Sequence, residues 1–236
     1  MSWGRRSLEP QPRWVRSVGK RLVIAGAGGF GRGVYGWVAG APGYRDEHGI
    51  DDIVFIDDRC ASAREPGPVA PAPIVDSIGD YQPDPSDEVL CAIGAPGARQ
   101  AVVGRLRAAR ARFHTYIDPR AILGEGVRVG IGSIVCPGSV LSSQVVVGEH
   151  VHINFNCSVG HDTTLSDFTT LSPAVNVMGE VPVGRLAFFG GTAVVLPRLS
   201  VGAEAVVGAG AVVIESVPEG ATVVGNPARI VRGRNG

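Results

Sequence analysis

The 236-residue chain lacks net charge, has few aromatic residues and contains no long apolar run. Basic and acidic residues number 22 each, so overall charge does not favour nucleic acid or an anionic membrane as a partner. The longest apolar stretches fall far short of the roughly 20 residues that a membrane-spanning helix needs. No Cys-x-x-Cys pair occurs, which favours free thiols in a reducing cytoplasm; the four cysteines are Cys60, Cys91, Cys136 and Cys157.

Positions 1–21 carry six basic residues, and Glu9 is the only acidic residue among them. The pair Arg5-Arg6 has the form of a twin-arginine export signal. The apolar run that should follow such a signal is limited to residues 22–25, which is too short. We therefore expect residues 1–20 to be a flexible basic extension.

Glycine and proline are abundant, with 34 and 17 residues, as in a chain that turns many corners. From Ile117 to Val213 an apolar residue recurs at every sixth position without insertion or deletion. The residue two places earlier is usually small or β-branched. Neither a helix nor a simple strand has a period of six, so each hexamer predicts one short strand followed by a corner. Three consecutive hexamers would form one triangular coil.

The part before this ladder reads as the start of a βαβ unit. A buried strand over 21–25 precedes a glycine-rich turn and a helical stretch, and a second strand over 53–56 ends in two aspartates. Glycines let a ligand approach the backbone, a helix N-terminus favours an anion, and carboxylates can accept sugar hydroxyls. A third strand over 89–93 and a further helix follow. These roughly 95 residues are too few for a dinucleotide oxidoreductase, and we expect a half-Rossmann domain that holds one nucleotide-like ligand.

One segment of the ladder carries unusual polar residues, and it ends in His161 and Asp162. His161 lies two residues after the inward-facing Val159, so it should sit outside the coil at a corner. A histidine titrates near neutral pH and can accept the proton of an amine or hydroxyl during acyl transfer. His150 and His152, in contrast, are expected at the surface or at a subunit interface.

The ladder, together with Val224-Gly-Asn-Pro-Ala228, resembles the left-handed parallel β-helix of hexapeptide-repeat acyltransferases. The order Gly-Ala-Gly-Gly-x-Gly, Phe-Ile-Asp-Asp, Ala-Ile-Gly, His-Asp and Gly-Asn-Pro-Ala is similar to the bacterial family of nucleotide-sugar N-acetyltransferases and sialic acid O-acetyltransferases. The resemblance implies a Rossmann-like βαβ domain over 21–114, a left-handed β-helix over 115–217 and a C-terminal tail over 218–236. The fold class expected is therefore α/β plus β-solenoid.

The resemblance also implies residue roles. His161 would be the general base, Asp162 its helper, and Gly179, one full coil further on, the donor to the oxyanion. A nucleotide sugar would contact Gly28, Gly29, Phe30, Asp57, Asp58, Gly94 and Asn154. Acetyl-CoA would lie between neighbouring β-helices of a homotrimer, against Thr170, Gly190, Gly191 and Ala209. The family often has histidine where Phe30 and Thr170 stand. No metal is expected.

The function predicted is acetyl-CoA-dependent N-acetylation of a nucleotide-linked amino sugar in the cytoplasm. O-acetylation of a free sugar such as a sialic acid would use the same base, so the sequence leaves it open. A metal enzyme similar to γ-type carbonic anhydrases would need three converging histidines, a pattern that His150, His152 and His161 do not present. A non-catalytic scaffold is the remaining alternative.

Overall fold

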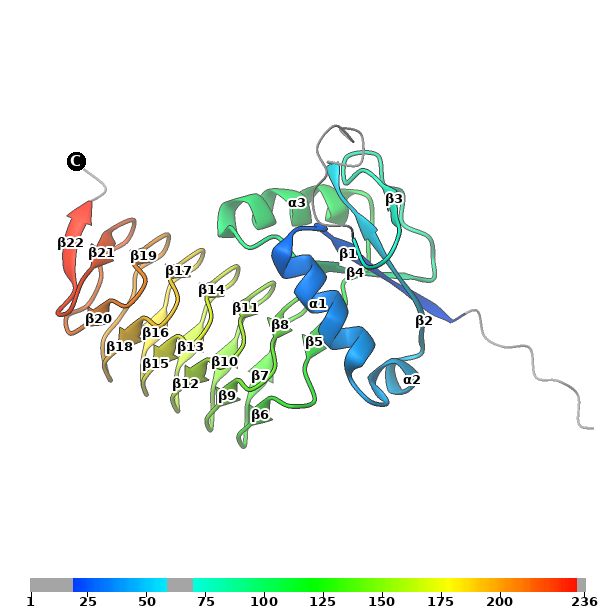
Figure 1. Cartoon of the computed structure of the whole chain (residues 1–236). Helices are drawn as coiled ribbons and strands as arrows, with labels where there is room; N and C mark the ends of the chain where they lie inside the picture. Colours follow the sequence, from blue (N-terminus) through cyan, green and yellow to red (C-terminus); the bar gives the residue numbers. More distant parts are fainter. Residues whose placement is uncertain (1–18, 59–69, 233–236) are drawn as a thin grey trace, which may run out of the picture.

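The computed structural model describes residues 19–58 and 70–232, which form an α/β domain followed by a parallel β-solenoid (Figure 1). This confirms the fold class predicted from the sequence. Cys60 and residues 1–18 of the basic extension lie outside the described residues. In the described part of the chain, no helix is both long and apolar enough to cross a bilayer.

The α/β domain is built on a four-stranded parallel sheet with the order β3-β2-β1-β4. Because β1 is central, the loop after β1 lies between the loops that follow β2 and β4. Its elements are β1 (Lys20–Ala25), α1 (Gly29–Gly40), α2 (Tyr44–His48), β2 (Ile50–Ile56), β3 (Ile74–Asp76), β4 (Asp87–Cys91) and α3 (Pro96–Ala108). Reversal of the strand order beside β1 leaves a crevice at the carboxyl ends of the strands, where open α/β sheets bind ligands.

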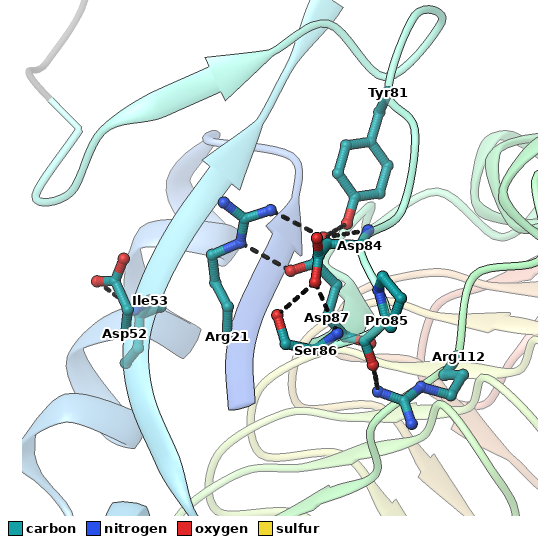
Figure 2. A network of polar contacts seen from close by, with 9 residues as sticks. All are labelled: Arg21, Asp52, Ile53, Tyr81, Asp84, Pro85, Ser86, Asp87 and Arg112. Atoms are coloured by element: carbon teal, nitrogen blue, oxygen red, sulfur yellow. Dashed lines mark hydrogen bonds and ion pairs between the residues drawn. The ribbon is translucent and has the colours of Figure 1, made fainter. Parts of the chain in front are cut away.

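At the opposite end of this sheet the buried carboxylate of Asp87 accepts several hydrogen bonds (Figure 2). Asp87, 1% exposed, accepts two hydrogen bonds from Arg21 at 2.7 and 2.9 Å and one from the Tyr81 hydroxyl at 2.5 Å. The Asp84 N–H is a fourth donor at 3.0 Å. Burial opposes ionisation, but these donors overcome it and hold the pKa of Asp87 below its usual value. The network joins β1 to β4 far from the crevice.

The solenoid has three faces built from parallel strands, and before the last coil each strand pairs with the strand three hexamers further along the chain, as His152 does with Thr170. The inward residues form one continuous core. The first face comprises β5 (Tyr116–Ile117), β8 (Ile134–Val135), β11 (His152–Ile153), β14 (Thr170–Leu171), β17 (Phe188–Phe189), β19 (Val206–Val207), β21 (Thr222–Val224) and β22 (Arg229–Arg232). The second comprises β6 (Ile122–Leu123), β9 (Val140–Leu141), β12 (Ser158–Val159), β15 (Asn176–Val177), β18 (Val194–Val195) and β20 (Val212–Val213). The third comprises β7 (Arg128–Val129), β10 (Val146–Val147), β13 (Thr164–Leu165) and β16 (Pro182–Val183).

The solenoid extends further than the six-residue ladder predicts. Val223 of β21 lies in the segment expected to be a tail, but it is buried in the solenoid core and pairs with Val207 of β19. Three full hexamers after Val207 would instead bring Gly225 to this place, so the last coil is shortened and leaves the strict period. The strand β22 then folds back antiparallel to β21 and ends the described chain.

The α/β domain packs on the first face of the solenoid, over its early coils (Figure 1). The ring centroid of Phe30 lies 4.9 Å from that of His152, and the ring centroids of Trp37 and Phe155 are 6.2 Å apart. Helix α3 covers the corner that precedes this face, between β10 and β11, where Arg107 pairs with Glu149. His150 and His152 are consequently 0% and 1% exposed, so the expectation that they lie at the surface or a subunit interface is wrong. Their positions do point out of the coil, but the α/β domain covers them.

Candidate active site

We call the three corners of the solenoid edge I, between the first and second faces, edge II, between the second and third, and edge III, between the third and first. His161 lies on edge II, directly after β12. Its Nδ1 is 2.8 Å from Asp162 Oδ2, and the two side chains are 55% and 58% exposed. Asp162 adopts a left-handed backbone conformation with φ 56°. A carboxylate that accepts the Nδ1 proton leaves Nε2 with its lone pair, the form that a general base requires.

Gly179 lies one coil further along edge II, immediately beside the His161 ring. A Cβ atom at this position would be 2.6 Å from Nε2 and 2.9 Å from Cδ2 and Cε1, so only glycine leaves the ring where it is. Within the described residues, the Gly179 N–H donates to no backbone carbonyl. Edge II thus places a candidate base next to an N–H that can donate to another group.

A separate cavity of about 400 Å³ opens in the α/β domain at the carboxyl ends of β1, β2 and β4. The glycine loop at the start of α1 forms one wall, and the start of α3 forms another. The lining includes six of the seven residues predicted to contact a nucleotide sugar: Gly28, Gly29, Phe30, Asp57, Asp58 and Gly94. A cavity of this size, between glycine-rich turns and two carboxylates, suits a nucleotide-like ligand.

The two aspartates in the cavity have different surroundings. Asp57 is 6% exposed, and its Oδ2 accepts the Ala27 N–H at 2.7 Å, which ties β2 to the glycine loop. The Asp58 side chain is 56% exposed, accepts the Gly79 N–H at 3.2 Å and lies 3.7 Å from the Arg105 guanidinium. Asp57 therefore shapes the loop, whereas Asp58 presents its carboxylate toward solvent.

The predicted acetyl-CoA contacts fall into two groups. Gly190, Gly191 and Ala209 lie together on edge I, where a Cβ on Gly190 would come 2.4 Å from the Ala209 nitrogen. Asn154 lies on the same edge, and its side chain accepts the N–H of Phe155 at 2.9 Å. In a single chain the second face separates this edge from His161.

Thr170 lies apart from the edge I group, on the first face beneath the α/β domain. It is 6% exposed, its hydroxyl donates to the Gly94 carbonyl at 3.1 Å, and it accepts from Arg99 at 2.9 Å. Arg99 of α3, which donates this hydrogen bond, is 0% exposed, although an arginine is expected on the polar side of a helix. A signal was present, because Arg99 falls at helical spacing with the buried Val102, Val103 and Leu106, on the apolar stripe of α3.

Among residues 19–58 and 70–232, no cluster of three or more histidine, cysteine, aspartate or glutamate side chains is arranged to hold a metal ion. The three described cysteines are free and buried.

The family of PglD N-terminal domains matches residues 21–106. GDP-perosamine N-acetyltransferase of Escherichia coli O157:H7 is 36% identical over 120 residues, which are 49% of this chain and 54% of that enzyme, so the chain spans about half of this relative. The acetyltransferase domain of PglB from Neisseria gonorrhoeae FA1090, solved with acetyl coenzyme A, aligns with a TM-score of 0.78 and 28% identity over 90% of this chain and 100% of that one. A variant of perosamine N-acetyltransferase from Caulobacter crescentus, solved with CoA and GDP-perosamine, aligns with a TM-score of 0.74 and 27% identity over 92% and 99%.

Hexamers wound into a parallel β-solenoid define the class of hexapeptide-repeat proteins, and in this chain a histidine–aspartate pair and a glycine lie together on one edge. The α/β domain narrows this class, because the structural neighbours that align over at least 90% of this chain are an acetyltransferase domain and a perosamine N-acetyltransferase. WeeI from Acinetobacter baumannii AYE aligns with a TM-score of 0.77 and 30% identity over 90% of this chain and 100% of that one. The chain belongs to the family of hexapeptide-repeat nucleotide-sugar N-acetyltransferases, which confirms the predicted family.

Proposed function

We propose that the protein transfers the acetyl group of acetyl-CoA to the amine of a nucleotide-linked amino sugar. The observation that carries this proposal is the contact between the His161 ring and Gly179 on a solenoid edge, in a chain that also has a nucleotide-sized cavity. The Neisseria and Caulobacter structures support the choice of ligands, since they contain acetyl coenzyme A in one case and CoA with GDP-perosamine in the other.

In the proposed reaction the neutral amine attacks the thioester carbonyl directly. His161 Nε2 accepts the amine proton as the C–N bond forms, and Asp162 stabilises the resulting imidazolium through Nδ1. Negative charge on the carbonyl oxygen is met by the Gly179 N–H. The C–S bond then breaks, and the CoA sulfur takes up the proton held by His161 and leaves as the thiol, which returns the histidine to its neutral form. No acyl-enzyme is needed, because the site holds both reactants together.

We propose that the complete site lies between two chains of a homotrimer. The cavity and the edge I residues are on one side of the chain, where α1 contacts Phe155 near the first face. His161 is on edge II, across the second face. In a threefold assembly, edge II of one chain would face edge I of the next, so acetyl-CoA would lie against Gly190, Gly191 and Ala209 of one subunit and His161 of the other. The free cysteines support a reducing, cytoplasmic location.

The test is CoA release from acetyl-CoA with a panel of nucleotide-linked 3-amino and 4-amino sugars and free sialic acid. His161→Ala should lower kcat by about two to four orders of magnitude, the usual contribution of a general base. His48→Ala is the matched control, because His48 is partly exposed on α2, away from the solenoid edges. His161→Ala should unfold at the wild-type temperature, because the His161 side chain is 55% exposed.

Wild-type activity in His161→Ala would remove the base from the proposal. Turnover of free sialic acid alone would replace N-acetylation by O-acetylation. Release of CoA that is independent of any sugar would show that the acceptor has been misassigned.

A further inference from the structure

The largest fully buried side chain of the described molecule is a cation, Arg99 of α3. Its guanidinium lies between the α/β domain and the first face of the solenoid. Within residues 19–58 and 70–232, no carboxylate forms an ion pair with it. Burial lowers the pKa of Arg99 to about 10, so the group is still charged at neutral pH. A buried charge without a counter-ion is costly, and its presence calls for an explanation from its contacts.

One terminal nitrogen of Arg99 faces the cavity wall. Nη1 donates to the carbonyl oxygens of Ile93 at 2.8 Å and Gly94 at 3.1 Å, and both residues line the cavity. These two carbonyls are thereby held in contact with Arg99. A cation bonded to a peptide carbonyl also polarises that peptide group, which makes its N–H a stronger donor.

The other terminal nitrogen faces the solenoid. Nη2 donates to the carbonyls of Phe168 at 2.7 Å and Thr169 at 3.2 Å and to the Thr170 hydroxyl at 2.9 Å. The Thr170 hydroxyl in turn donates to the Gly94 carbonyl at 3.1 Å, so the cavity wall is also tied directly to β14.

His152 completes this cluster. Its Nε2 lies 2.9 Å from the Cys91 carbonyl, which can only accept, so Nε2 carries the proton and Nδ1 accepts from Arg99 at 3.0 Å. Burial and the neighbouring Arg99 charge hold the pKa of His152 well below its usual value. The cluster is therefore a set of acceptors from both domains arranged around one guanidinium.

We propose that Arg99 is a positioning residue for the nucleotide cavity, which fixes the Ile93–Gly94 wall against the solenoid, and that Thr170 serves the same wall instead of acetyl-CoA. The proposal rests on the proposed function, since it assumes that the cavity takes the nucleotide part of the acceptor. It assigns both residues to acceptor binding and neither to the acetyl donor. The wall and the solenoid edges then keep a fixed spacing, so a bound sugar is presented at a constant distance from the edges.

The experiment compares two dissociation constants by calorimetry on the full-length protein: that of CoA, and that of whichever of UDP, GDP and dTDP the wild type binds most tightly. Arg99→Lys keeps the charge but loses the fork that reaches both domains, and should weaken nucleotide binding about tenfold, the effect of losing hydrogen bonds to a charged group. Thr170→Val keeps the shape and should weaken nucleotide binding by about threefold. In both variants CoA should bind within twofold of wild type.

Arg107→Ala is the matched control, because Arg107 is also on α3 and contacts Glu149 of the solenoid, but it does not touch the cavity wall. It should change neither constant. The proposal is overturned if nucleotide binding is unchanged in both Arg99→Lys and Thr170→Val, if CoA binding weakens as much as nucleotide binding, or if Arg107→Ala has the same effect. Thr170→Val covers the case in which Arg99→Lys does not fold.

These dissociation constants distinguish a failure of the proposed function from a failure of the proposed role of Arg99. If the wild type binds nucleotide and CoA but acetylates no amino sugar, the proposed function fails while the predicted pattern of constants still supports the role of Arg99. If the wild type binds none of the three nucleotides, the role of the cavity and the role of Arg99 are both wrong.

Discussion

Replacing Gly179 by alanine tests the geometry of edge II most directly. The new Cβ would lie 2.6 Å from His161 Nε2 and 2.9 Å from two ring carbons, well inside ordinary contact distances. The backbone at Gly179 does not have a positive φ, so alanine itself is compatible with the local conformation. The ring is 55% exposed and can rotate into solvent. The clash is therefore relieved by moving the base, without disturbing the core.

This geometry predicts separate effects on stability and activity. The free energy of unfolding should change by less than about 1 kcal/mol, as for other surface substitutions. The value of kcat should fall by about 100-fold or more, equivalent to about 2.7 kcal/mol, because a displaced base no longer reaches the amine. Urea unfolding measures the change in stability, and steady-state CoA release measures the change in kcat.

A double-mutant cycle with His161→Ala identifies the cause of the loss. If alanine acts by displacing the ring, the double variant should be no slower than His161→Ala alone. Gly104→Ala is the control, since a Cβ there meets nothing within 4 Å on an exposed face of α3. Wild-type kcat in Gly179→Ala would refute the contact between base and glycine. A loss that accompanies unfolding would refute the claim that the clash is confined to the ring.

Three further predictions concern charge. Asp162→Asn should lower kcat by about 10- to 100-fold, because an amide does not stabilise the His161 imidazolium as a carboxylate does; unchanged kcat would show that the pair has no role. Burial lowers the pKa of His150 to about 4 from about 6.5 in the unfolded chain, so between these pH values only the unfolded chain gains that proton and stability falls as pH falls, by up to about 1.4 kcal/mol per unit. The free energy of unfolding, measured with urea at pH 7.5 and pH 5, gives this pH dependence. In His150→Asn the dependence should be smaller by the contribution of this one histidine. Asp87→Asn should destabilise the α/β domain by about 2–3 kcal/mol, because Arg21 loses its carboxylate partner, and an unchanged unfolding temperature would contradict the network in Figure 2.

The sequence alone determined the solenoid and the pairing of His161 with Gly179. Both follow from a local rule: one position in every six faces inward and each strand stacks on the strand three hexamers away, so neighbours in space are neighbours in the repeat. The crevice of the α/β domain was likewise predictable, because glycine turns and strand ends at their observed spacing converge in a parallel sheet. Even here the rule failed at Val223, where the last coil is shortened.

The tertiary structure alone decided which polar residues are exposed. His150 and His152 are buried because the α/β domain covers that side of the solenoid, and nothing in the six-residue repeat specifies which side is covered. The different surroundings of Asp57 and Asp58 have the same origin, since only the folded loop brings the Ala27 N–H to one carboxylate and leaves the other toward solvent. Repeats are encoded by contacts between residues a fixed distance apart in the sequence, whereas docking depends on the summed fit of two surfaces, and that fit exists only after both domains have folded.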